Sequence, residues 1–215
     1  MATQKPFTRF DGIAAVLMRD NIDTDVIIPS REITSPSREG YGVKLFAPWR
    51  YEAPGPQDND RVERADFVLN RAPWRMATIL VTGPNFGCGS SREMAVWALA
   101  QFGFRAIVAP SFGSIFKSNC IRNGVLPLEL ALPQVVSLAA LCESAATPLH
   151  INLPGSLLCA PDGSEYRFSL DDDDREMLMT GMDAIDRTWQ LRDAIEAFEA
   201  ADRLRRPWIW AQSLR

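Results

Sequence analysis

The feature that most limits how this chain can fold is an alternation of strand-like and helix-like segments between residues 76 and 130. Short apolar runs are typical of buried strands, and the longer runs between them have the length of helices. Strands are predicted for MATILV (76–81), RAIVAP (105–110) and VLPLEL (125–130), and helices for residues 91–102 and 111–123. Because each helix carries the chain from one strand to the next, the strands are expected to be parallel.

Segments on either side of this region add further strands and a helix. GIAAVLM (12–18) predicts a first strand, and residues 133–146 predict a loose helix. The turn residues of PDGS lie between apolar runs, which indicates a β-meander formed by LHINL, GSLLCA and YRFSL. Gly124, after the second central helix, can end that helix in left-handed geometry.

The C-terminal part is predicted to be helical. The acidic run Asp171–Asp174 suits the first turn of a helix, because carboxylates complement the helix macrodipole there, and this interpretation is favoured over a metal site. A later amphipathic helix spans residues 193–206. With 215 residues and 47% apolar content, the chain can form one substantial core. We therefore expect an α/β fold with a single domain over residues 1–215, in which residues 171–215 are a helical extension packed on that domain.

Charge, hydropathy and cysteine spacing argue against several classes of function. The net charge of −4 provides no basic surface for nucleic acid. The N-terminus does not read as a signal peptide, and no apolar run approaches the ~20 residues of a membrane span, so we expect a cytoplasmic protein that contacts no membrane. The cysteines show no CxxC pattern, which argues against a zinc or iron–sulfur site held by this chain alone. They are Cys88, Cys120, Cys142 and Cys159.

The single histidine argues against a hydrolase. His150 lies in LHINL, whose alternation is typical of a half-buried strand, and a structural role is favoured for it. Without a second imidazole, a Ser-His-Asp or Cys-His site is poorly supported, and GCGSS does not match the GxSxG nucleophile elbow.

The stretch NFGCGSSRE (85–93) combines a Gly-rich turn with adjacent hydroxyls and a cation. A turn between a strand and a helix directs the first free N–H groups of the helix outward, which makes an anion site. Ser90 and Ser91 add donors, and Arg92 can bind a carboxylate through two parallel hydrogen bonds. The spacing of Ser90 and Glu93 equally suits a helix capping box, so both interpretations stay open on spacing alone.

The motif and several other segments together resemble one enzyme family. GPNFGCGSSRE is similar to the signature of the small subunits of the 3-isopropylmalate dehydratase family, in the aconitase superfamily. The other matching segments, in order from about Phe10 to Ala200, are NIDTDVIIP, LFAPWRY, ADFVLN, RAIVAPSFGSIFKSNCIRNGVLPLEL and TGMDAIDRTWQLRDAIEAFEA. The resemblance implies a swivelling β/β/α domain that docks onto a large subunit carrying a [4Fe–4S] cluster, with no cofactor bound by this chain. It implies the isomerisation of 2-isopropylmalate and 3-isopropylmalate in leucine biosynthesis, by dehydration and rehydration.

The resemblance also implies roles for the motif residues. Ser90 would be the base that removes the carbon-bound proton, while Ser91 and Arg92 would bind a substrate carboxylate. Because a free serine is a poor base, the site must stabilise its alkoxide, and a helix N-terminus beside Arg92 suits that task.

Two neighbouring sets of residues are expected to support these groups. NIDTD resembles the polar turn of the family at the same cleft, although an aspartate there also suits an Asx turn. Its orienting residues would be Asp23, Thr24 and Asp25, and the turn itself would be supported by Gly87, Cys88 and Gly89. For Cys88 we favour the interpretation of a small packed residue in that turn.

Substrate specificity is less fixed by the resemblance. Arg38 lies where the superfamily places a second substrate arginine, and Ile33 could contact an isopropyl group. The family usually has an aromatic or leucine side chain in this segment, whereas this chain has Glu32. A carboxylate beside an isopropyl group would be unfavourable. Met94 and Trp189 also depart from the family pattern, which has histidine and a smaller aliphatic residue there.

Two alternatives therefore stay open on the sequence. The first is a hydro-lyase for another branched or methylated C4 diacid, of the dimethylmalate or citramalate type, and the second is a non-catalytic anion-binding module. Retention of both serine hydroxyls and of Arg92 argues against the second. In a hydro-lyase for either class of diacid, the long polar loops 30–42 and 52–64 are expected to act as lids.

Overall fold

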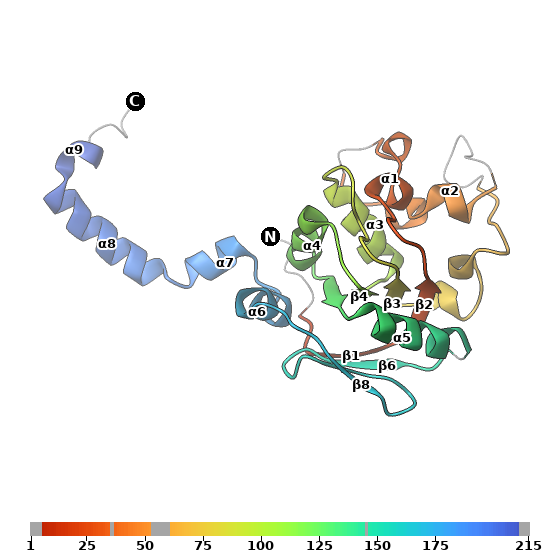
Figure 1. Cartoon of the computed structure of the whole chain (residues 1–215). Helices are drawn as coiled ribbons and strands as arrows, with labels where there is room; N and C mark the ends of the chain where they lie inside the picture. Colours follow the sequence, from red (N-terminus) through yellow and green to blue (C-terminus); the bar gives the residue numbers. More distant parts are fainter. Residues whose placement is uncertain (1–5, 35–36, 53–60, 145, 211–215) are drawn as a thin grey trace. The chain divides into compact units, whose positions relative to one another are not determined.

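The computed structural model describes residues 6–34, 37–52, 61–144 and 146–210. The chain divides into two compact units, one formed by Gln4–Gly181 and the other mainly by Met182–Arg215. The first unit holds both sheets and the predicted α/β fold (Figure 1).

A parallel sheet forms the centre of the larger unit, as the sequence predicted. Its strands lie in chain order and all neighbours are parallel. They are β2 (Ala14–Leu17), β3 (Ile79–Thr82), β4 (Ala106–Ala109) and β5 (Leu126–Glu129). The crossovers are α3 (Glu93–Phe102) and α4 (Ser114–Arg122). Gly124 follows α4 with a φ of 71°, which confirms the left-handed helix end.

An antiparallel sheet forms a second layer and contains the predicted meander. The meander strands are β6 (Leu149–Asn152), β7 (Leu157–Cys159) and β8 (Glu165–Arg167). The free edge of β6 pairs with β1 (Arg9–Gly12), which the sequence did not predict. The single strand expected over residues 12–18 is therefore wrong in its start, because Gly12 ends β1 and the chain then changes sheets. A Cβ on Gly12 would lie 2.2 Å from Thr78 Oγ1, so only glycine fits this corner.

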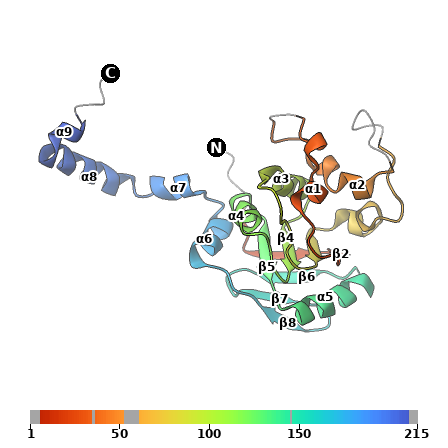
Figure 2. The ribbon, with the colours of Figure 1, turned by 45° about the horizontal axis from the view of Figure 1, so that its top comes forward.

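The parallel sheet has the antiparallel sheet on one face and α3 and α4 on the other (Figures 1 and 2), and each face carries one part of the core. One face packs against the antiparallel sheet and α5 (Leu132–Ser144), and its buried side chains include Val81, Val108, Leu138 and Leu158. The other face is covered by α3 and α4, with Leu80, Ile107, Leu99 and Phe116 in its core. Both faces of β3 and β4 are buried, which explains their uninterrupted apolar sequences. The layers are thus sheet, sheet and helix, as expected.

Short helices follow β2 and contain the polar turn singled out by the sequence. They are α1 (Thr24–Ile27), the 3₁₀ turns η1 (Ser30–Glu32) and η2 (Gly42–Lys44), and α2 (Ala47–Arg50). Further along the chain lie the 3₁₀ turns η4 (Val68–Asn70) and η5 (Trp74–Met76). Within the two predicted lid loops, residues 35–36 and 53–60 lie outside the described residues.

The C-terminal helices divide between the two units. α6 (Asp172–Thr180) begins in the acidic run, ends at Gly181 with a φ of 70°, and belongs to the larger unit, whose core includes Leu178. The smaller unit contains α7 (Ala184–Trp189), α8 (Arg192–Arg205) and α9 (Pro207–Trp210). None of the helices in the described ranges has the length and apolar character needed to cross a membrane.

His150 has the structural setting that its strand predicted. It lies on the exposed side of β6, opposite Asp11 of β1, and its Nδ1 is 2.7 Å from Asp11 Oδ1. This cross-strand pair joins two strands that are far apart in the sequence.

Candidate functional site

The predicted site residues gather where the parallel strands end. The segments that follow β2, β3 and β4 meet at the carboxyl edge of the sheet, which is the usual ligand-binding edge in folds with parallel strands. Backbone hydrogen bonds join the three segments. Gly87 N donates to Ile22 O at 2.7 Å, and Thr24 N donates to Cys88 O at 2.9 Å. On the other side, Gly113 N donates to Phe86 O at 2.9 Å.

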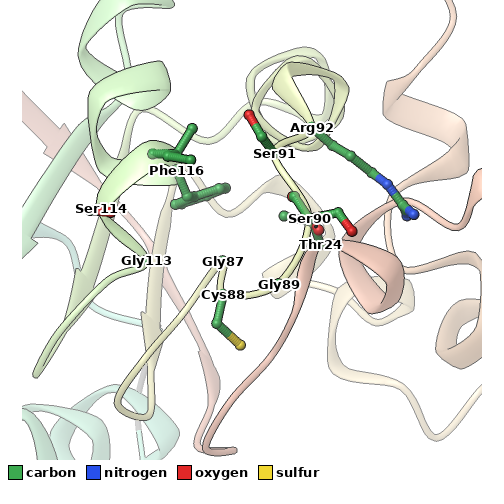
Figure 3. A pocket seen from close by; sticks show the side chains of 11 residues that line it. Thr24, Gly87, Cys88, Gly89, Ser90, Ser91, Arg92, Gly113, Ser114 and Phe116 are labelled. Atoms are coloured by element: carbon green, nitrogen blue, oxygen red, sulfur yellow. Dashed lines mark hydrogen bonds between the residues drawn. The ribbon is translucent and has the colours of Figure 1, made fainter.

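Gly87 has to be a glycine in this arrangement. Its φ is +72°, and an added Cβ would lie 2.2 Å from the ring of Phe116. Figure 3 shows the Phe116 side chain beside this turn. The close approach of the loop to α4 therefore requires a residue without a side chain.

A pocket of about 180 Å³ opens between the starts of α3 and α4. It is lined by Thr24, Gly87, Cys88, Gly89, Ser90, Ser91, Arg92, Gly113, Ser114, Ile115 and Phe116 (Figure 3). Seven of these eleven residues come from the predicted NIDTD and SSRE regions. The other four lie at the start of α4, and the sequence did not single them out; they are Gly113, Ser114, Ile115 and Phe116. Asp23 and Asp25 flank Thr24 just outside the lining.

The electrostatics of the pocket favour an anion. The N-terminal ends of α3 and α4 both lie at it, and neither helix has a side-chain cap. Free N–H groups and the positive ends of two helix dipoles are therefore directed towards the same space.

The capping-box interpretation of the SSRE motif is not supported by the geometry. α3 begins at Glu93 with Arg92 as its N-cap, so Ser90 lies before the capping position. Glu93 Oε1 accepts a hydrogen bond from Asn123 Nδ2 at 3.0 Å instead of reaching back to the loop. Ser90 lines the pocket and is exposed.

Arg92 is held in place by α1 and η1. Its Nη1 donates to Asp25 Oδ1 at 2.5 Å and to the carbonyl of Ile28 at 3.1 Å. Its Nη2 donates to Ser30 Oγ at 2.8 Å. The Arg92 side chain is only 16% exposed, whereas that of Asp25 is 55% exposed. The guanidinium is therefore a positioned cation, and its acidic partner has room to move.

The other residues of the NIDTD turn also have defined contacts. Asp23 caps α1, because its Oδ1 accepts from Val26 N at 2.8 Å. The buried Thr24 hydroxyl donates to the backbone carbonyl of Ser90 at 2.8 Å. This last bond ties α1 directly to the residue expected to be the base.

Cys88 is not placed as a nucleophile. Burial raises the pKa of its thiol, and the nearby Asp23 carboxylate raises that pKa further, so the thiol is protonated at neutral pH. Within the described residues, His, Cys, Asp and Glu side chains form no group of three or more that could hold a metal ion.

Two predicted specificity residues lie away from the pocket lining. Arg38 stacks on Trp97 of α3, with its guanidinium carbon 5.0 Å from the ring centre. Ile33 packs against the core on the helix side of the sheet. The apolar wall of the pocket is instead formed by Ile115 and Phe116, and Ile115 is 54% exposed. The SFGS turn before α4 repeats the glycine-then-serine pattern of the first loop, which is the signal that could have identified these residues.

Glu32 is turned into a buried ion pair. Its Oε2 lies 2.6 Å from Arg61 Nη2, and the two side chains are 6% and 7% exposed. The expectation that the Glu32 carboxylate lies free beside the substrate is therefore wrong, because Glu32 does not line the pocket.

Comparisons with known proteins agree with this geometry. Residues 4–133 match the aconitase C-terminal domain family. The chain is 50% identical over 207 residues to the 3-isopropylmalate dehydratase small subunit of Cupriavidus necator, covering 95% of this chain and 98% of that protein. It is 44% identical over 211 residues to the subunit of the same name from Methylibium petroleiphilum, covering 95% and 97%.

A solved structure shows the same fold. The crystal structure of 3-isopropylmalate dehydratase from Methanocaldococcus jannaschii has a TM-score of 0.61 and 24% identity, covering 89% of this chain and 99% of that one. The chain belongs to the family of 3-isopropylmalate dehydratase small subunits, in the aconitase superfamily.

Proposed function

We propose that this protein is the small subunit of a two-subunit hydro-lyase that interconverts 2-isopropylmalate and 3-isopropylmalate in leucine biosynthesis, in the cytoplasm. The observation that carries the proposal is the pocket in which Ser90 and Ser91 lie beside a fixed Arg92, at the starts of two helices. Whole-length similarity to named small subunits supports it.

Binding of the diacid would use the positive groups of the pocket. One substrate carboxylate would be bound by Arg92 and Ser91, with the N–H groups at the start of α3 nearby. Because Asp25 is half exposed, its carboxylate can turn into solvent and leave the guanidinium to the substrate. Ile115 offers an apolar surface in the same pocket for the branched alkyl group.

Ser90 would remove the proton from the carbon next to a carboxylate. The C–H electron pair forms the carbon–carbon double bond, the hydroxyl leaves the neighbouring carbon, and the proton passes to the serine oxygen. Rehydration reverses these steps with the hydroxyl added at the other carbon. The helix dipole and Arg92 favour the alkoxide form of Ser90 on which the proton transfer depends.

The departing hydroxyl needs a Lewis acid, and the part of this chain that the structure describes holds no group of metal-ligating side chains. Similarity to the aconitase superfamily supports a [4Fe–4S] cluster on the large subunit, where it would polarise the hydroxyl. This division of roles makes the isolated chain inactive by itself.

The substrate assignment is supported by the position of Glu32. On the sequence alone, other diacids stayed open as alternatives, partly because Glu32 was expected beside the alkyl group. With Glu32 bound to Arg61, that reason for considering a dimethylmalate or citramalate substrate no longer applies.

The test uses the chain reconstituted anaerobically with the cluster-loaded large subunit. Hydration of isopropylmaleate is followed by the loss of its alkene absorbance, with citramalate-type and dimethylmalate-type substrates compared in parallel. Ser90→Ala should abolish turnover with modest change in KM, since only the base is lost. Ser137→Ala, an exposed serine on α5, should match the wild type. Near-normal turnover of Ser90→Ala would refute the assignment of the base.

A further inference from the structure

The 3₁₀ turn η1 joins two different interactions. At its start, Ser30 Oγ accepts a hydrogen bond from Arg92 Nη2 at 2.8 Å. At its end, Glu32 forms the buried ion pair with Arg61, whose Nη2 and Oε2 atoms are 2.6 Å apart. Since the turn is only three residues long, its two ends cannot shift independently.

Arg61 is itself firmly placed. Its guanidinium carbon lies 5.1 Å from the ring centre of Tyr51. The backbone that follows Arg61 pairs with residues at and just beyond the end of α2, because Glu52 N donates to Val62 O at 2.9 Å and Arg64 N donates to Arg50 O at 2.8 Å. The position of Arg61 is therefore set by the body of the domain.

The side chain of Glu32 is buried. A buried charge is tolerated only when it is paired, so the ion pair fixes where Glu32 can lie. Lys44 Nζ also donates to the Glu32 carbonyl at 3.0 Å, which fixes the backbone of the same residue.

We propose that the buried Glu32–Arg61 ion pair is a positioning device that holds η1 so that Ser30 fixes the orientation of the substrate-binding Arg92. Neither residue of the pair lines the site pocket. The kinetic consequence of the pair rests on the proposed function of Arg92, whereas its structural consequence can be measured on the chain alone.

The first experiment measures the guanidinium of Arg92 in the free chain by NMR with isotope-labelled arginine, assigned with Arg92→Lys. In the wild type, three hydrogen bonds should slow rotation of the guanidinium and protect its protons from exchange. In Glu32→Gln and in Arg61→Gln, rotation of the Arg92 guanidinium and exchange of its protons should both become faster. Arg167→Gln is the control, since Arg167 is an exposed arginine on β8 away from η1, and it should leave the Arg92 signals unchanged.

The second experiment measures kinetics in the reconstituted complex. Loss of orientation should raise KM and lower kcat/KM by roughly ten- to a hundredfold, as misplacement by a remote change can do, with little change in kcat per folded complex. A purely structural role would lower the folded fraction and leave KM unchanged. If a single variant fails to fold, Glu32→Gln/Arg61→Gln leaves no unpaired buried charge, and it should show the same KM increase.

The outcomes separate the two proposals. A wild-type complex without turnover would refute the proposed function, while the Arg92 signals would still decide the positioning role. Arg92 signals that are the same in the wild type and in the folded double variant would overturn the positioning role, whatever the activity.

Discussion

At the scale of single residues, the loop that carries Ser90 depends on a hydroxyl from another part of the chain. Thr24 is 2% exposed and donates to the Ser90 carbonyl at 2.8 Å. Thr24→Val should cost about 1 kcal/mol of stability, because the carbonyl loses its donor. It should also lower kcat, because Ser90 is no longer held at the reacting carbon.

A second buried threonine provides the control for this prediction. Thr82 is fully buried and its hydroxyl donates to Leu17 O at 3.0 Å, between β2 and β3. Thr82→Val should show a similar loss of stability in chemical denaturation and an unchanged kcat. Equal kcat values for the two variants would mean that the bond from Thr24 has no role in placing Ser90.

Glycine in the site loop can be tested in the same way. Gly87→Ala meets both a φ of +72° and the Phe116 ring, whereas Gly163→Ala meets a φ of +87° with no atom within 4 Å. Gly163→Ala should therefore cost about 1 kcal/mol from the left-handed backbone alone. Gly87→Ala should cost roughly 1–3 kcal/mol more from overpacking. Equal melting temperatures for the two variants would contradict the close approach of Phe116 to the loop.

At the scale of elements, the sequence predicted those helices and strands that depend on local patterns of apolar and turn residues. The apolar runs of β3, β4 and β5 predicted the order of the strands, and Gly124 predicted the end of α4. The apolar pattern could not predict β1 as a separate strand paired with β6, because that pairing joins segments that are far apart in the sequence. The same reason applies to Glu32 and Arg61, which are 29 residues apart.

The residues of the site were also predicted only in part. Resemblance located the SSRE and NIDTD segments, and the structure places them in contact. It did not locate Ile115, whose role as an apolar wall follows only from the meeting of α4 with the loop after β3. Arg38 and Ile33 remain predictions as substrate contacts, because neither lines the pocket of the free subunit.

Helix packing also predicts the reactivity of the cysteines. Cys120 of α4 is fully buried and Cys142 of α5 is 3% exposed, while Cys88 and Cys159 are partly exposed. Burial raises the pKa of Cys142 to about 11, with a smaller contribution from Glu143. Alkylation of the native protein near pH 8, read by mass spectrometry, should modify Cys88 and Cys159 and spare the two helix cysteines. In denaturant all four should react at similar rates.

The raised pKa also gives a pH dependence. A thiol whose folded pKa lies above the ordinary value of 9.0 stabilises the fold fully below that value. The contribution of Cys142 should disappear as the pH rises towards about 11. Denaturation midpoints of the wild type and of Cys142→Ala should therefore converge across this range, and parallel curves would contradict the burial of the thiol.

At the scale of the whole molecule, the division after Gly181 predicts where the chain can be shortened. The larger unit includes α6, with Leu178 in its core and the Leu178 carbonyl bonded to Phe7 N at 2.9 Å. The expected packing of the C-terminal extension on the domain stays a prediction, and truncation tests it. A chain that ends at Gly181 should unfold cooperatively, because its core is complete.

The matched control for this truncation is a chain that ends at Leu170. It also loses α6, so the core loses Leu178 and the bond to Phe7, and cooperative unfolding should be lost or the melting temperature should fall sharply.

For the chain that ends at Gly181, packing of the extension would appear as a lower melting temperature than that of the full chain, since about 1 kcal/mol shifts the midpoint by roughly 2–4 °C at this size. An unchanged midpoint would contradict the packing, and a failure of this chain to fold would contradict a self-contained core in residues 4–181. Both chains are compared by circular dichroism during heating, with the full chain measured in the same buffer.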